Sequence, residues 1–227
     1  MLKTLIWCSV CGNYRYTHDD IEVTYISLKH RTDRQALIEA ELDQMGVPYT
    51  RTTALAVSPS ILMVPIKRPG KRKEILGTIG CALSHARALE ASNKSTLVLE
   101  DDATFRYIPN LRRLLQQDWW DVIAFAFNGR FNPQQCRVVH GTQYCRSPGF
   151  LTTSAYFVRD EYKSGLIGAF RTSAKRLIMG EKPKYAAPDV AWQSLAKKDR
   201  WYVAVPQIAR QRPSYSDIQF KKVDYGV

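Results

Sequence analysis

The chain has 227 residues, of which 45% are hydrophobic and 24% are charged, and this composition excludes a disordered protein. Its 33 Lys and Arg residues outnumber 21 Asp and Glu residues, which gives a net charge of +12. A chain this basic should attract anions such as nucleotides, phosphorylated glycans, acidic lipid headgroups or nucleic acid.

The longest apolar run near the start is residues 5–11, LIWCSVC. It is too short to span a bilayer and lacks the long core and cleavage site of a signal peptide, so we expect a cytoplasmic protein whose residues 1–20 form an extension of uncertain role. Five cysteines in no regular framework favour free thiols in a reducing compartment. The alternative is a four-sulfur metal site formed by Cys8, Cys11, Cys136 and Cys145.

The first part of the chain predicts a β-α-β unit. Residues 22–28, EVTYISL, predict a strand, and Thr32 with Gln35 has the spacing of a capping box that begins a helix. Gly46 and Pro48 end that helix, and residues 49–55 predict a second strand. Two strands joined through a helix indicate a parallel sheet.

The middle and end of the chain continue this alternation. Residues 67–73, KRPGKRK, predict an exposed basic loop. A helix over 80–91 and a strand over 96–99 follow. Later segments complete one α/β domain over residues 1–227, and these are strands over 121–127, 151–158 and 201–205 and a helix over 190–197.

Three consecutive carboxylates, Glu100, Asp101 and Asp102, come directly after the strand over 96–99. Ligands of open α/β sheets bind at the carboxyl ends of strands, so this position indicates a functional site. The carboxylates repel one another, and a metal ion, a ligand's cation or Lys and Arg side chains should oppose their charge. In an extended chain Glu100 and Asp102 point to one side, so Asp101 should point elsewhere and pair with Arg or with the backbone.

Several motifs together resemble glycosyltransferase family 25, which includes bacterial lipooligosaccharide β-galactosyltransferases and collagen hydroxylysine galactosyltransferases. They span most of the chain after residue 22 and follow the order of the family. The matching segments are YISLKHRTDR at 25–34, GTIGCALSH at 77–85, LVLEDDATF at 97–105, TTSAYFV at 152–158, PD at 188–189 and PQIARQRPSYSDI at 206–218.

This resemblance implies a single GT-A-like (Rossmann-like) nucleotide-sugar-binding domain with a mostly parallel central sheet. It implies an inverting transferase that moves galactose from UDP-galactose to a glycan of the lipooligosaccharide type or to a hydroxylated acceptor, as in lipopolysaccharide biosynthesis. The sequence differs from the family at Ser27-Leu28-Lys29, near Ala56 and at Thr78, where the nucleotide base and ribose are expected. The identity of the donor therefore stays open.

The motifs also assign roles to individual residues. A divalent cation, Mn²⁺ or Mg²⁺, would offset the charge of the leaving nucleotide, with Asp102 as direct ligand and Glu100 beside it. Asp189 is the candidate base that takes the proton of the acceptor hydroxyl, and its alternative is a helix N-cap. The remaining candidates, expected near the donor or the metal, are Arg31, Arg34, His85, Asp101, Gln211 and Asp217.

Each candidate near the donor has a structural alternative. His85 could equally make a polar contact on a helix face, and Arg31 and Arg34 could be solvated charges at a helix start. Gln211 and Asp217 could belong to a segment that covers the end of the sheet.

Other functions stay open at this stage. The same fold could use another UDP-sugar such as UDP-glucose or a UDP-N-acetylhexosamine, because a few pocket contacts set that choice. The charge and the basic segment would also suit a nucleic-acid-binding protein, although that interpretation explains none of the ordered motifs, so no nucleic acid is expected. A third alternative is a non-catalytic interaction protein, and the basic face also suits peripheral contact with an anionic membrane.

Overall fold

The central sheet contains eight strands in the order β2-β1-β3-β10-β5-β11-β8-β7. The structure is a computed structural model, and it describes residues 20–46, 48–107, 109–218 and 221–223. Its strands are β1 (Ile21–Ser27), β2 (Thr50–Thr53), β3 (Ser95–Glu100), β5 (Val122–Ala124), β7 (Asn132–Val139), β8 (Thr142–Arg146), β10 (Ala155–Val158) and β11 (Trp201–Val205).

Strand direction confirms the predicted α/β class. β1 is parallel to β2 and β3, and β5 is parallel to β11, whereas β10 and β8 are antiparallel to their neighbours. Six of the eight strands therefore point the same way. Three two-stranded sheets are built from β12 (Ala209–Gln211) with β4 (Ala103–Phe105), β13 (Ser214–Ser216) with β14 (Lys221–Val223), and β6 (Asn128–Gly129) with β9 (Phe150–Leu151).

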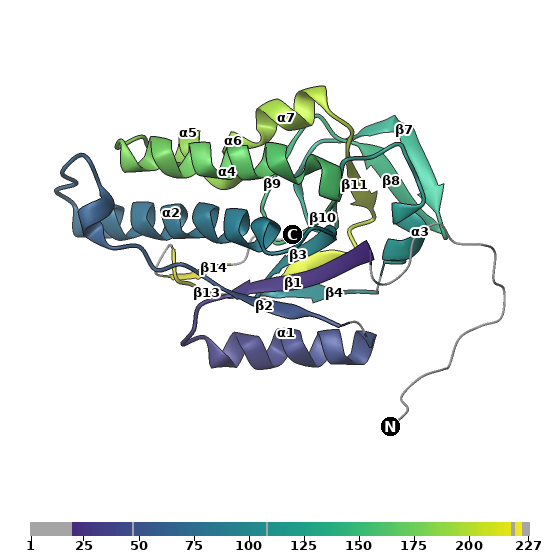
Figure 1. Cartoon of the computed structure of the whole chain (residues 1–227), viewed down its shortest axis with the longest axis horizontal. Helices are drawn as coiled ribbons and strands as arrows, with labels where there is room; N and C mark the ends of the chain where they lie inside the picture. The colour runs from purple at the N-terminus through teal and green to yellow at the C-terminus, as the bar shows by residue number, and fades with distance from the viewer. Residues whose placement is uncertain (1–19, 47, 108, 219–220, 224–227) are drawn as a thin grey trace.

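Helices cover both faces of the sheet, as Figure 1 shows. One face carries α2 and α4 side by side with the short helices α5 to α7, and the other face carries α1. The helices are α1 (Thr32–Met45), α2 (Pro69–Glu90), α3 (Leu111–Leu115), α4 (Lys163–Ile178), α5 (Pro183–Ala186), α6 (Pro188–Ala191) and α7 (Gln193–Lys198), with 3₁₀ turns at Pro59–Ile61 and Asp160–Tyr162.

Alternation along β3 shows how the two apolar layers form. Leu97 and Leu99 belong to the layer that contains Leu42 of α1, whereas Val98 belongs to the layer that contains Leu89 of α2. Successive side chains of a strand point to opposite faces, so β3 needs apolar or small residues on both faces. This is why its sequence is the continuous run STLVLE, buried up to Glu100.

The first predicted helix exists, but its predicted cap is wrong. Arg31 is the N-cap of α1 and Thr32 is already helical, and no side chain caps this end. Gln35 instead donates from Nε2 to the carbonyl oxygen of Leu28 at 2.8 Å. The predicted end is confirmed, because Gly46 has a φ of 61°, which favours glycine, and its N–H donates to Asp43 O.

The prediction of a basic loop at residues 67–73 is also wrong. The helix α2 begins at Pro69 rather than at residue 80, and Lys71, Arg72 and Lys73 lie in its first turns. Proline is favoured at the first helical position, where its missing N–H has no partner to lose. A Pro-Gly pair is typical of a turn between two elements, but here it begins a long helix.

Two elements escape the sequence patterns altogether. The β7–β8 hairpin was not predicted, since β7 is mostly exposed and lacks apolar alternation. Helix α4 was not predicted either, although it packs antiparallel along α2, with Leu177 near its end beside Ile75 near the start of α2. The predicted strand over 151–158 is divided into β9 and β10, and the helix over 190–197 into α6 and α7.

Candidate active site

The three carboxylates lie where β3 ends, as the sequence predicts. Glu100 is the last residue of the strand, and Asp101 and Asp102 form the turn that leads into β4. The Asp101 N–H donates to Ile26 O of the neighbouring β1 at 3.1 Å. Because Asp101 and Asp102 form a turn, the backbone is not extended beyond Glu100. The prediction that Glu100 and Asp102 share a side because they are two apart in a strand is therefore wrong in its premise.

Arg34 of α1 contacts both aspartates of this turn. Its Nη1 lies 2.8 Å from Asp101 Oδ1 and 3.0 Å from Asp102 Oδ2. Its Nη2 donates to Ser214 Oγ at 2.6 Å and to Tyr215 O at 2.7 Å. Arg34 thus connects the acidic turn to the C-terminal segment, and both of its terminal nitrogens already have protein acceptors.

Asp102 has one oxygen that is satisfied and one that is not. Its Oδ2 accepts from Arg34 and from Gln211 Nε2, the latter at 3.2 Å. Its Oδ1 is buried and has no hydrogen-bond partner among the described residues. Burial first, and then the charge of Glu100, raise the pKa of Asp102 from 3.8 to about 7. A buried carboxylate oxygen without a donor is a position that a cation would stabilise.

Asp101 is fixed on the side of the turn that faces β1. It accepts from Ser27 Oγ at 2.7 Å in addition to Arg34. Burial raises its pKa, and these hydrogen bonds oppose the shift. The expected pairing of Asp101 with an arginine is thus confirmed, and Ser27 is a contact that the sequence patterns missed.

Glu100 is held by side chains from α2 and from the segment before β10. Its Oε1 lies 3.3 Å from His85 Nε2 and accepts from Thr153 Oγ1 at 2.5 Å. Burial raises the pKa of Glu100, but the contact with His85 and the bond from Thr153 outweigh that effect, so the net shift is downward. The pKa of Glu100 is therefore lowered, whereas that of Asp102 is raised.

His85 lies behind Glu100 and is 1% exposed. Its Nδ1 is 3.1 Å from the hydroxyl of Tyr156, which is also fully buried. In this position His85 orients Glu100, whose side chain is more exposed than that of His85. His85 thus makes a polar contact from the face of α2, which was the structural alternative for this residue.

Cys81 lies one helical turn before His85 on the same face of α2. Ligand atoms of Cys81, His85 and Glu100 all lie within 4.8 Å of one another, so these residues could hold a metal ion. A sulfur, nitrogen and oxygen set suits Zn²⁺, whereas oxygen ligands alone suit Mg²⁺ or Mn²⁺. Gly80 lets α2 pack directly against the segment that follows β2, because a Cβ at Gly80 would lie 2.3 Å from Leu55 O.

Asp189 joins the site from α6. It lies in the first turn of that helix, whose N-cap is Ala187, so the alternative that Asp189 is the N-cap is wrong. Its Oδ2 accepts from the backbone N–H of Thr152 at 3.1 Å. Burial raises the pKa of Asp189, as does the negative charge of Glu100.

The remaining sequence candidates lie at the edge of this group. Arg31 pairs with Asp33 at 2.9 Å and also with Asp217. His30 is 4.0 Å from Asp217. Arg31 and Asp217 thus hold each other, and through them the loop after β1 contacts the segment after β13.

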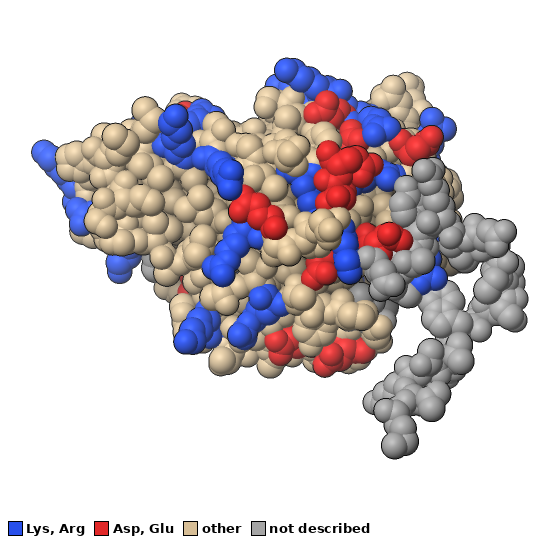
Figure 2. Space-filling view, in the orientation of Figure 1, with Lys and Arg blue, Asp and Glu red and all other residues tan. Residues whose placement is uncertain are grey.

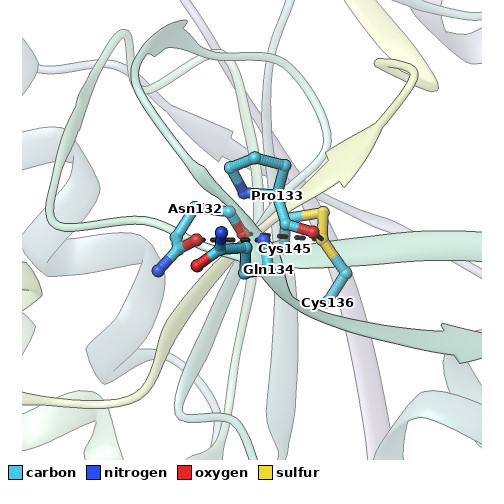
Figure 3. Close-up of a disulfide and its surroundings, with 5 residues drawn as sticks. All are labelled: Asn132, Pro133, Gln134, Cys136 and Cys145. Carbon is cyan, nitrogen blue, oxygen red and sulfur yellow. Dashed lines mark hydrogen bonds between the residues drawn. A yellow bond between two sulfur atoms is a disulfide. The ribbon is translucent and has the colours of Figure 1, made fainter.

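The cysteine prediction needs correction. Cys136 of β7 and Cys145 of β8 are paired residues of the hairpin and form a disulfide, with Cα atoms 4.0 Å apart. Figure 3 shows this bond beside Asn132, whose Oδ1 accepts from the N–H of Gln134. The free-thiol interpretation therefore fails for Cys136 and Cys145, and with it goes the cysteine argument for a reducing compartment. Cys8 and Cys11 lie outside the described residues.

The described helices also bear on membrane insertion. None of them is both long enough and apolar enough to cross a bilayer.

The acidic turn thus lies at the carboxyl end of β3, which is the edge of the sheet where open α/β folds bind their ligands. The sequence profile of the family described as "Glycosyltransferase family 25 (LPS biosynthesis protein)" matches residues 21–119. The match covers less than half of the chain, and it includes β1, α1, α2, β3 and the acidic turn. It agrees with the resemblance drawn from the motifs at 25–34, 77–85 and 97–105.

The other comparisons are weaker. The solved structure of A197 from STIV has 12% sequence identity and a TM-score of 0.42, over 81% of this chain and 80% of that one. Mannose-1-phosphate geranyltransferase from Thermus thermophilus has 14% identity and a TM-score of 0.40, over 85% of this chain and 74% of that one. No curated protein sequence matches this chain.

Proposed function

We propose that this chain transfers a hexose, galactose first, from a UDP-sugar to a hydroxyl group of a glycan or another hydroxylated acceptor, with inversion at the anomeric carbon. The observation that supports this most is the buried, unpartnered Oδ1 of Asp102 at the carboxyl end of β3, inside the region that matches the glycosyltransferase family. That atom needs a positive partner, and nucleotide-sugar chemistry supplies one as a bound divalent cation.

The charge of the acidic turn fits such a cation. Glu100, Asp101 and Asp102 meet one buried guanidinium, that of Arg34, and Asp189 adds a further carboxylate nearby. The negative surplus is what a divalent ion would neutralise. Asp102 and Glu100 would hold Mn²⁺ or Mg²⁺, which would stabilise the negative charge of the departing diphosphate.

Asp189 would act as the base. It would accept the proton of the acceptor hydroxyl as that oxygen forms its bond to the anomeric carbon, while the bond between that carbon and the UDP oxygen breaks and its electron pair leaves with UDP. A raised pKa brings a carboxylate closer to neutral pH, which makes it a stronger base than an exposed aspartate. The Thr152 N–H would hold Oδ2 and leave Oδ1 for the proton.

His85 and Thr153 would be positioning residues for Glu100. They contact its Oε1 from two sides, so the carboxylate would keep one orientation while substrates bind and products leave. Gln211 would do the same for Asp102 from the C-terminal segment.

The first experiment measures donor and metal together. Melting temperature and sugar release would be recorded with a panel of UDP-sugars, each with Mn²⁺, Mg²⁺, Zn²⁺ or no metal. We expect stabilisation by a UDP-hexose with Mn²⁺ or Mg²⁺. Stabilisation by Zn²⁺ alone would direct the metal to Cys81, His85 and Glu100 instead. No response to any UDP-sugar would contradict the proposal.

Matched variants make this experiment specific. Asp102→Asn should lose the response to Mn²⁺ with UDP-hexose. Asp121→Asn is the control, because Asp121 is 7% exposed against 6% for Asp102. Asp121 pairs with Arg200 and lies just before β5, at the edge of the sheet opposite the acidic turn. If Asp121→Asn lost the response equally, the loss would reflect general destabilisation.

The non-catalytic alternative has its own signature. A protein that keeps the fold as an interaction scaffold would show neither sugar release nor transfer, even where a nucleotide stabilises it.

A further inference from the structure

One end of the molecule supplies most of the chain's net positive charge. It is formed by residues 61–75 and 175–186, and we name these two segments the basic end. They contain nine Lys or Arg residues and two Glu residues, so they supply +7 of the total of +12. Both glutamates are paired within the same end, Glu74 with Lys71 and Glu181 with Arg176.

The two segments are neighbours in space. The N–H of Met63 donates to Ile178 O at 3.0 Å, and a Cβ on Gly180 would contact Val64. Beneath them Ile75 and Leu177 lie in one apolar cluster. Figure 1 shows the first turns of α2 beside α5 and the end of α4, and Figure 2 shows Lys and Arg side chains along that margin of the molecule.

Large apolar side chains protrude among these charges. Met63 is 76% exposed, Met179 57% and Tyr185 53%, and Val64 is 37% exposed. These are four of the nine exposed large hydrophobic residues in the described part of the chain. Tyr185 lies under the ammonium group of Lys184, 4.5 Å from its ring centroid.

We propose that the basic end docks on an anionic membrane surface, with Met63, Met179 and Tyr185 inserted between lipid headgroups and the surrounding Lys and Arg side chains paired with phosphates. Basic charge alone would suit a nucleic acid equally well, since both surfaces are polyanionic. The protruding methionines decide for the membrane: they gain free energy from burial in a lipid interface, whereas a phosphate backbone offers them no apolar contact.

The docked orientation has a consequence for the reaction, and this step depends on the proposed function. Lys73 and Cys81 are eight residues apart on α2, about 12 Å along the helix axis. The thiol of Cys81 lies within 4.8 Å of ligand atoms of Glu100 and His85. The acidic site would thus be held at a short height above the bilayer.

Vesicle binding tests the docking by itself. Sedimentation would compare vesicles of phosphatidylcholine with vesicles of phosphatidylcholine and phosphatidylglycerol in equal parts. We expect binding only to the anionic vesicles. A triple variant, Lys71→Gln with Arg72→Gln and Lys73→Gln, should bind them roughly 100-fold more weakly, since each basic residue near a surface contributes about 1 kcal/mol.

The matched control neutralises three exposed basic residues elsewhere, Arg137, Lys197 and Lys198. Because salt screens charges beyond about 10 Å, these should weaken binding only slightly. A double variant, Met63→Gln with Met179→Gln, should remove the vesicle binding that persists at high salt. Equal loss in the control, equal binding to neutral vesicles, or tighter binding to a DNA duplex than to anionic vesicles would each overturn the proposal.

The outcome is separable from that of the proposed function. Release of sugar from the UDP-hexose in solution should be unchanged in the triple variant, because none of its residues lies in the acidic site. Vesicle binding without sugar release or transfer would support the docking and contradict the transferase proposal. Sugar transfer without vesicle binding would support the transferase proposal and contradict the docking.

Discussion

Asp189 accepts a hydrogen bond from the backbone N–H of Thr152, and Thr152 holds a φ of 76°. A β-branched residue rarely adopts this left-handed region, and such backbone costs roughly 1–3 kcal/mol. The Thr152 hydroxyl is also bonded to Ser154 Oγ at 2.6 Å, which fixes the strained residue. The strain thus coincides with the amide that orients the candidate base.

This contact leads to the first prediction. Asp189→Asn should retain the bond to Thr152 through its amide oxygen and keep its affinity for UDP-sugar, but lower sugar transfer by about 100-fold or more, because an amide cannot accept the proton. The transfer rate at saturating donor and acceptor, paired with the melting temperature, measures this. A wild-type rate would remove Asp189 from the mechanism and direct the search to Asp217.

The second prediction concerns pH. The pKa of Asp102 is raised to about 7 in the folded protein from 3.8, so the folded state holds this proton more tightly than the unfolded state. The stability that protonation contributes is fully present below about pH 4 and is lost as pH rises to 7, by at most about 4 kcal/mol. Urea unfolding of the metal-free protein between pH 4 and 8 measures it.

Asp102→Asn is the control for this pH profile. Asp101 and Asp189 shift in the same direction and Glu100 in the other, so only the difference between wild type and variant isolates Asp102. We expect the variant to be less pH-dependent, and Mn²⁺ to stabilise the wild type most near pH 8. Identical profiles for the two proteins would contradict the assignment.

A third prediction separates two roles of Arg34. In the first role Arg34 is the cation that pairs with Asp101 and Asp102. Arg34→Met would remove this pairing and should lower the free energy of unfolding by roughly 3–5 kcal/mol. Mn²⁺ should restore part of this loss by replacing the positive charge.

The control is Arg171→Met, which removes a largely exposed pair with Glu90 and should cost no more than about 1 kcal/mol. If Arg34→Met instead kept wild-type stability and raised only the KM for the donor, Arg34 would be a donor-binding residue, as the motifs suggest.

The fourth prediction concerns the hairpin disulfide. Cys136 and Cys145 are nine positions apart in the sequence, and a disulfide that closes a loop of this length stabilises the folded protein by about 2–3 kcal/mol. Replacing both cysteines with serine should lower the stability by this amount and remove its dependence on reductant. Peptide mapping without reductant should recover the two cysteines in one linked fragment, and recovery of both as free thiols would contradict the bond.

The sequence by itself determined the elements whose local pattern is unambiguous. The run STLVLE must be a buried strand because every residue before Glu100 is apolar or small, and the following carboxylates must lie at its end. Gly46 ends the first helix because its left-handed backbone favours glycine. The ordered motifs around these elements were sufficient to indicate the family.

Only the tertiary structure decided which partners the carboxylates have. Arg34 is separated from Asp101 by 67 residues and Gln211 from Asp102 by 109, and no local pattern reports contacts at that distance. The same reason hid the burial of His85 behind Glu100. The position of the Pro-Gly segment at the start of α2 was also decided by packing, because the first turns of α2 bury Ile75 against α4 and the loop before Pro69. Helix ends depend on such packing as much as on local propensity.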